Sequence, residues 1–356
     1  MASVLKPVDE TRMLEKIGGS LVETNLFDVS IIGYPSEARP TGIRVSPLPP
    51  FKRLSFKRLV APWIVFRKIN EIKPEIIIIN TPELLFIAAL QRIFFGRKIV
   101  YDVLENYYRT ILYTSTYPPV LKTILAFAVR LQEILFAPSV SRFFFAERGY
   151  IDELKFAKSP IVLQNKMPKA LAAAYRRTVT GNSKLIFSGT LAETSGVFEA
   201  INLCKNLHKA DPSYKLTLIG YCSMESVLGK IKDEIKDSSF IKLIGGNCLV
   251  PHSQILEEIS KADFGIIIYP NNPSTISSIP TKLFEYVALQ LPILIRHNAE
   301  SHKLVEEYHV GIILDASLNY ESLSRKIKTH PIQPAVSDAI NWDFEAGNLI
   351  ACLKLL

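Results

Sequence analysis

Along the first 165 residues, short apolar runs alternate with longer segments whose apolar positions recur at helical spacing. Ile76–Ile79 is an unbroken apolar run, as is typical of a parallel strand covered on both faces. Further strands are expected at Val29–Gly33, Arg44–Leu48, Lys98–Val103 and Arg142–Phe145, and helices at Glu10–Val22, Pro82–Phe95 and Val120–Phe136. This alternation predicts βαβ units and a doubly wound parallel sheet.

The same alternation continues in the second half of the chain. Strands are expected at Lys184–Ser188, Lys215–Ile219, Ile241–Ile244 and Phe264–Tyr269, with helices at Ser195–Lys209, Ser223–Lys236 and His252–Ser260. Glycine follows the first three of these strands. Because a backbone without Cβ lets a ligand approach closely, these strand ends are candidate binding positions.

The stretch Ile279–Ile295, IPTKLFEYVALQLPILI, predicts a helix that leads into a buried strand. Pro280 suits the start of a helix, and the apolar positions from Leu283 onward form one stripe. Lys282 and Glu285 share the polar side near the helix start. Two interpretations fit: a core-facing helix with a surface Lys–Glu pair, which periodicity alone favours, or an anion site at a positive helix N-terminus.

The same stretch resembles the donor-sugar motif of retaining GT-B glycosyltransferases of family 4 (group 1), P-x-K-x-x-E followed by a helix and P-x-I. This type is common in bacterial surface-polysaccharide synthesis. The resemblance implies two facing, doubly wound Rossmann-like domains: residues 1–165 for the acceptor and residues 166–340 for the nucleotide-sugar. Residues 341–356 would form a helix crossing back to the first domain, anchored by Trp342.

The resemblance also implies a set of donor-side residues. Lys282 and Glu285 are the catalytic candidates, the lysine as the cation for the diphosphate and the glutamate as the ligand of the ribose. Three family positions differ here, since Thr190 and Ser195 replace basic residues and Ser277 replaces a glutamate. The donor-binding candidates are Gly189, Thr190, Gly220, Leu249, Val250, Ser277, Ser278, Thr281, Lys282 and Glu285.

On the acceptor side the resemblance is weaker. The first strand, Ala2–Leu5, is expected to be short or partly missing, and Leu104 stands where the family has a histidine. The acceptor-side candidates are Asp9, Arg12, Asp102, Glu105 and Asn106. The nearby tyrosines either form a wall for an acceptor sugar or pack beneath the next helix; they are Tyr107, Tyr108, Tyr113 and Tyr117.

Composition narrows the class of protein further. A length of 356 residues with 48% hydrophobic residues suits two domains. No uncharged apolar run reaches transmembrane length, the first residues lack a signal-peptide pattern, and the four cysteines are scattered, so a cytoplasmic protein is expected. We expect no metal site and no cofactor, the nucleotide-sugar being a substrate.

The charge of the chain is uneven. Residues 1–165 hold 22 Lys and Arg against 15 Asp and Glu, out of a net charge of +8 for the whole chain. Phe51–Ile72 interleaves basic with aromatic and aliphatic residues. This segment suits an anionic membrane surface, which predicts a peripheral protein on the inner face of the plasma membrane, or a core-facing helix with a solvated basic side. A nucleic-acid partner is not expected.

These patterns together predict a metal-independent retaining glycosyltransferase. It would move a sugar from a nucleoside-diphosphate sugar to a glycan or lipid-linked acceptor. The first alternative is a GT-B-like partner or binding subunit with little or no turnover, because four family positions differ. A nucleotide-sugar epimerase of the same shape is a less favoured alternative.

Overall fold

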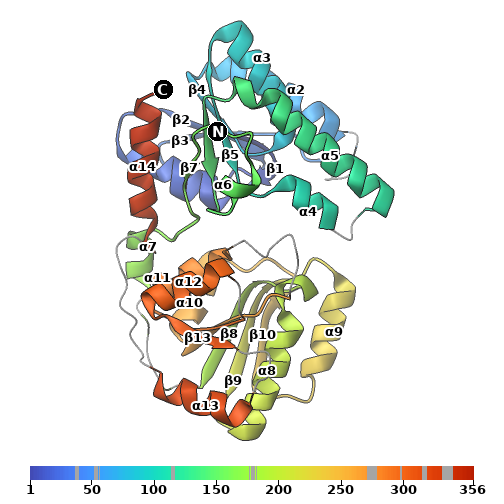
Figure 1. Ribbon diagram of the computed structural model, residues 1–356, viewed down its shortest axis with the longest axis vertical. Coiled ribbons are helices and arrows are strands. Elements are labelled where there is room, and N and C mark those ends of the chain that lie inside the picture. Colours follow the sequence, from blue (N-terminus) through green and yellow to red (C-terminus); the bar gives the residue numbers. More distant parts are fainter. Residues whose placement is uncertain are drawn as a thin grey trace. The chain divides into compact units, whose positions relative to one another are not determined.

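The computed structural model describes residues 1–36, 40–51, 55, 57–113, 117–175, 177, 181, 183–270, 279–296, 299–314, 319–330 and 340–356. The chain divides into two compact units: Met1–Asn165 together with Trp342–Leu356, and Lys166–Asn341 (Figure 1). Each unit is built on one parallel sheet with helices on its faces. This confirms the predicted class of two doubly wound α/β domains.

The first unit has a seven-stranded sheet in the order β3-β2-β1-β4-β5-β6-β7. The first strand is neither short nor missing, because Ala2–Pro7 forms a six-residue strand between β2 and β4 in the interior of the sheet. The strands are β1 (Ala2–Pro7), β2 (Val29–Tyr34), β3 (Ile43–Pro47), β4 (Ile76–Ile79), β5 (Lys98–Val103), β6 (Arg142–Phe145) and β7 (Ile161–Val162).

Helices cover this sheet, and one of them comes from the far end of the sequence. Trp342, at the start of α14, is buried and donates a hydrogen bond from Nε1 to Ser20 Oγ at 2.8 Å, and α14 belongs to the first unit. The helices are η1 (Arg12–Gly18), α1 (Gly19–Glu23), α2 (Lys57–Ile72), η2 (Pro82–Leu84), α3 (Leu85–Phe95), α4 (Tyr107–Tyr113), α5 (Pro119–Phe136), η3 (Ala137–Ser139), α6 (Tyr150–Glu153) and α14 (Trp342–Lys354).

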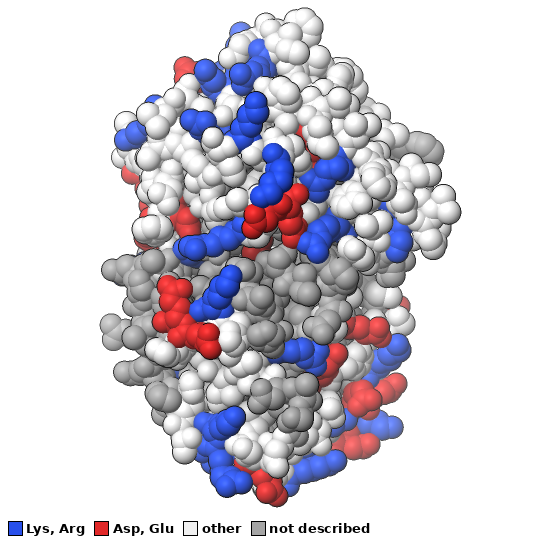
Figure 2. All heavy atoms as spheres, viewed as in Figure 1, with Lys and Arg blue, Asp and Glu red and all other residues white. Residues whose placement is uncertain are grey.

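The surface of the first unit is unevenly polar. On the face drawn in Figure 2, mainly uncharged side chains cover α5. None of the helices in the described ranges combines the length and the hydrophobicity that crossing a bilayer requires.

The second unit has a six-stranded sheet in the order β10-β9-β8-β11-β12-β13. Its strands are β8 (Lys184–Thr190), β9 (Lys215–Tyr221), β10 (Ile241–Gly246), β11 (Phe264–Ile267), β12 (Ile293–Arg296) and β13 (Gly311–Leu314). Its helices are α7 (Lys169–Ala174), η4 (Glu193–Ser195), α8 (Val197–Ala210), α9 (Glu225–Ile235), α10 (His252–Ser260), α11 (Thr281–Ala288), α12 (Ala299–Tyr308) and α13 (Tyr320–Thr329).

Helix α11 connects the paired strands β11 and β12, so its N-terminus lies at the carboxyl edge of the second sheet. Pro280 precedes the helix with φ −59°, a value that proline adopts without strain. Leu283, Phe284 and Val287 are buried in the core below. Because this apolar stripe packs into the core, the polar side of the first helical turn faces away from the core.

Candidate functional site

A cavity of about 280 Å³ opens at the carboxyl edge of the second sheet. The end of β8, the start of α10, the segment after β11 and the first turns of α11 supply its walls. Five of the predicted donor-side residues meet there, because parallel strands place their ends on one edge. The lining residues are Ser188, Gly189, Thr190, His252, Ile255, Tyr269, Thr281, Lys282 and Glu285.

Lys282 is a buried cation within this cavity wall. Lys282 is only 8% exposed, and its Nζ has no hydrogen-bond partner among the described residues. The Nζ lies 4.0 Å from the ring centroid of Phe187 and 5.1 Å from that of Tyr269. Burial lowers the pKa of Lys282 to about 7, although Glu285 opposes the shift. The Nζ of Lys282 is therefore a candidate donor to an anion in the cavity.

Glu285 is oriented by a residue that the sequence analysis did not single out. His252 Nε2 lies 3.1 Å from Glu285 Oε1, across the cavity from α10 to α11. His252 opens the helix that follows β10, and five residues separate it from the Gly245–Gly246 end of that strand. The strand-end rule therefore contained a signal for His252 that periodicity alone does not give.

Glycine occupies two of the strand ends for different physical reasons. Gly189 has φ +96°, and a Cβ there would meet no atom within 4 Å, so its backbone borders open space in the cavity wall. Gly220 has φ +149°, and a Cβ there would lie 1.7 Å from the carbonyl oxygen of Gly189. Close approach of the neighbouring strand thus requires a glycine at position 220.

The other donor-side predictions fall outside the cavity lining. Gly220, Leu249 and Val250 are described but do not border it, and Leu249 is exposed. Ser195 is buried and donates from Oγ to the carbonyl of Thr190 at 2.6 Å, which closes the turn after β8. Ser277 and Ser278 lie outside the described residues.

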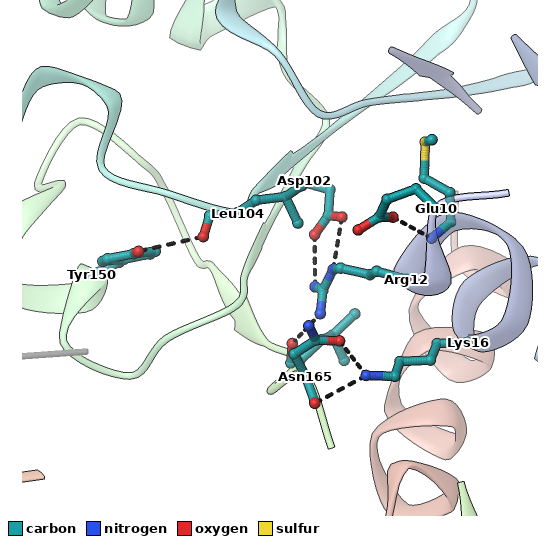
Figure 3. Close-up of polar contacts among 9 residues, drawn as sticks. Glu10, Arg12, Lys16, Asp102, Leu104, Tyr150 and Asn165 are labelled. Carbon is teal, nitrogen blue, oxygen red and sulfur yellow. Dashed lines mark hydrogen bonds and ion pairs between the residues drawn. The ribbon is translucent and has the colours of Figure 1, made fainter. Parts of the chain in front are cut away.

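In the first unit, Arg12 and Asp102 bind each other (Figure 3). The Arg12 guanidinium donates to both carboxylate oxygens, at 2.9 and 2.7 Å, and to the carbonyl of Leu163 at 2.8 Å. Both side chains are 1% exposed. Burial opposes the charge of Arg12, but the Asp102 carboxylate overcomes it, so the pKa of Arg12 is raised. Their partners lie inside the unit, where the pair connects η1 to β5; the acceptor role of these two residues stays a prediction.

The remaining acceptor-side candidates differ in their surroundings. Asn106 is buried, donates to Glu153 Oε2 at 2.6 Å and accepts from Arg130 Nη2 at 2.7 Å, so it is also engaged within the unit. Asp9 is exposed and accepts a hydrogen bond from Ser36. Glu105 is half-buried.

The tyrosines after β5 follow the packing interpretation at two positions. Tyr107 is buried and donates to the carbonyl of Asn80 at 3.0 Å. Tyr108 contacts Phe127 of α5 edge to face, with ring centroids 5.5 Å apart. The residues Tyr107–Tyr113 form helix α4, and α5 packs against it.

Comparisons with known proteins agree with this architecture. Residues 174–330 match the sequence model of a family described as glycosyl transferases group 1. No curated protein matches the chain in sequence. The matched residues 174–330 make up most of the second unit, which contains the cavity.

Several solved structures are similar over nearly the whole chain. HepE from Anabaena, solved with UDP and glucose, is 13% identical with a TM-score of 0.69, over 100% of this chain and 99% of that one. Sucrose-phosphate synthase from Thermosynechococcus elongatus is 12% identical (TM-score 0.67; 96% and 92% covered). WaaG, a glycosyltransferase involved in lipopolysaccharide biosynthesis, is 13% identical (0.66; 98% and 93%). These likenesses establish the GT-B fold.

Proposed function

We propose that this protein is a retaining glycosyltransferase that takes a sugar from a nucleoside-diphosphate sugar and transfers it to a glycan or lipid-linked acceptor. One observation carries the proposal. A buried lysine without a hydrogen-bond partner among the described residues lines a cavity beside a glutamate, at the N-terminus of a helix and the carboxyl edge of a parallel sheet. An activated sugar supplies the matching groups, since it has a diphosphate for the cation and a ribose for the carboxylate.

In this proposal each residue of the cavity has a defined task. Lys282 and the N-terminal turn of α11, which begins at Thr281, bind the diphosphate. Glu285 accepts hydrogen bonds from the ribose hydroxyls, and His252 positions its carboxylate. The backbone at Gly189 and Thr190 borders the sugar phosphate. Of the other predicted residues, we assign Gly220, Leu249 and Val250 to the nucleobase, and Ser277 and Ser278 to the sugar.

The proposed chemistry needs no strong base from the protein. The bond between the sugar C1 and the phosphate oxygen breaks, and the acceptor oxygen forms a new bond to C1 on the same face. The acceptor proton passes to the departing diphosphate. Lys282 stabilises the charge that develops on the diphosphate, and its surroundings of Phe187 and Tyr269 strengthen that interaction because little water screens it. We propose that the reaction is independent of metal.

The solved relatives support the choice of donor and acceptor class. HepE was solved with UDP and glucose, and WaaG is described as acting in lipopolysaccharide biosynthesis. We therefore favour a UDP-sugar as the first donor to test and a surface-polysaccharide precursor as the acceptor. Such an acceptor would place the protein at the cytoplasmic face of a membrane, with Phe51–Ile72 as one candidate contact.

The test is nucleotide release from a panel of UDP-, GDP- and dTDP-sugars with mixed glycan and lipid-linked acceptors. We expect release with one donor, its loss in Lys282→Ala and Glu285→Ala, and its retention in Lys209→Ala, which removes an exposed lysine of the same unit. NMR of the product gives the anomeric configuration. Donor binding without release would favour the partner subunit, and sugar interconversion without acceptor the epimerase. Absence of donor binding would refute the proposal.

A further inference from the structure

Helix α5 has its polar and apolar sides reversed. A surface helix normally turns its apolar side inward and its charges toward water. In α5 the three charged residues are half-buried or buried: Lys122, Arg130 and Glu133. Beyond Pro119, which opens the helix, the exposed positions are Val120, Leu121, Thr123, Ile124, Phe127, Ala128, Leu131, Ile134 and Leu135, with Thr123 as their one polar member. We call these nine positions the apolar face.

Exposed apolar side chains on two neighbouring helices continue this surface. At the end of α3, Ile93, Phe94 and Phe95 are exposed, Phe94 by 70%. On α2, Trp63 is 50% exposed and contacts Phe86 of α3 edge to face at 6.1 Å. Phe86 in turn contacts Phe136 at the end of α5 at 5.9 Å. Aromatic contacts therefore connect all three helices, which lie together in Figure 1 and carry mainly uncharged atoms in Figure 2.

The segment that carries these three helices is predominantly basic. The segment from Phe51 to Phe136 holds 13 Lys and Arg against six Asp and Glu. Lys57 and Arg67 are exposed on α2, and Lys98 is exposed just after α3. Glu71, near the end of α2, is the exposed acidic residue of that helix. A partner of this surface should therefore be apolar where it meets α5 and negatively charged at the border.

We propose that the apolar face docks on an anionic lipid bilayer, with α5 lying along the membrane surface. At 1.5 Å per residue the helix is about 27 Å long, and it would bury one side in the acyl boundary rather than cross it. Trp63 is half exposed and contacts Phe86 of α3, and tryptophan is enriched at membrane interfaces. The main contact is thus α5 with the end of α3, and the segment Phe51–Ile72 contributes its border.

A protein partner fits the apolar face less well. Protein interfaces carry roughly one hydrogen bond per 100–200 Å². The nine positions offer a single hydroxyl, from Thr123, and no amide or charged group. An acyl layer needs no such bonds, and anionic headgroups would attract the basic border at about 1 kcal/mol for each lysine or arginine.

Vesicle flotation tests the proposal with phosphatidylcholine vesicles containing about one-third phosphatidylglycerol. We expect the full-length protein to float with these vesicles and to bind pure phosphatidylcholine less. The combined variant Ile124→Glu, Phe127→Glu and Leu131→Glu should lose roughly tenfold or more of its partitioning. The matched control, Leu26→Glu, Met224→Glu and Leu355→Glu, changes three exposed apolar residues elsewhere and should bind as the wild type.

Tryptophan fluorescence gives a second readout that does not depend on the triple variant. Brominated lipids should quench Trp63 on binding, while Trp342 is buried and should not respond. Trp63→Phe should remove the quenching and leave the flotation. Equal flotation of the triple variant and the wild type would overturn the proposal. So would a wild-type dimer that ignores vesicles and becomes a monomer in the triple variant, which would make the apolar face an interface between copies.

Discussion

The two units each bury a cation, and the two cations are treated in opposite ways. Arg12 in the first unit is held by both oxygens of Asp102 and by a backbone carbonyl, and its pKa is raised. Lys282 in the second unit faces two aromatic rings, and burial lowers its pKa to about 7. The difference teaches that burial alone does not identify a functional charge. A buried charge that has its counter-ion stabilises the fold, whereas one without it is available to a ligand.

The largest effect is expected from removing the counter-ion of Arg12. Asp102→Ala leaves a guanidinium charge buried without its partner, which typically costs about 3–5 kcal/mol. Urea unfolding of the variant measures the loss. The double variant Arg12→Met with Asp102→Leu removes both charges and should lose less. A loss below about 1 kcal/mol for Asp102→Ala would contradict the structural role of the pair.

Removing the buried charge of Lys282 should have the opposite effect on stability. The folded-state pKa lies below the value of 10.5 for a free lysine, so the unfolded chain binds the additional proton between about pH 7 and 10.5. Lys282 is therefore most destabilising below pH 7, and Lys282→Met should raise the unfolding midpoint more at pH 6 than at pH 9. Nucleotide release should fall about 100-fold or more.

The matched control for this prediction is Lys209→Met, which removes an exposed lysine and should leave both stability and release unchanged. If Lys282→Met destabilised the protein and kept its activity, the lysine would have a structural role, like Arg12, and no role in binding the donor.

A smaller effect is expected from replacing His252. This change tests whether the histidine positions the Glu285 carboxylate. His252→Ala removes one hydrogen bond to the carboxylate, so the KM for the donor should rise about tenfold while kcat changes less. In combination with Glu285→Gln the two effects should not add, because the histidine acts through the glutamate. Full additivity would show that His252 contributes independently.

The smallest effect is a proton taken up with the donor. At pH 8 Lys282 is mostly neutral in the free protein, and a diphosphate nearby favours its charged form. Titration calorimetry in buffers of different ionisation enthalpy should detect uptake of up to about one proton at pH 8 and almost none at pH 5.5. Lys282→Met should bind donor weakly and without uptake. Equal uptake at both pH values would assign the proton to another group.

The sequence predicts the fold well and the site in part. Apolar runs such as Ile76–Ile79 mark strands whatever their neighbours. The strand-end rule pointed to Gly189, while the family resemblance singled out Lys282 and Glu285. Strand β1 was underestimated because Ala2 and Ser3 are poor strand formers, and their burial comes from pairing with β2 and β4. That pairing depends on the strand order, which the local pattern does not contain.

Contacts between distant residues escaped prediction for the same reason. Arg12 and Asp102 are 90 residues apart, and His252 and Glu285 are 33 apart. Their meeting depends on which strands become neighbours. In α5 the helix itself was predicted, but a segment apolar on most of its circumference does not reveal which side the fold covers.

Helix α14 has a consequence for the order in which the protein is made. Trp342, Leu349 and Leu353 belong to the same core as Ile31 and Val100, yet the entire second unit lies between them in the sequence. During translation the second unit can finish folding first, because its residues emerge from the ribosome without interruption. The first unit must wait with an open core until the final helix arrives. Chaperones should therefore engage the nascent first unit more than the second.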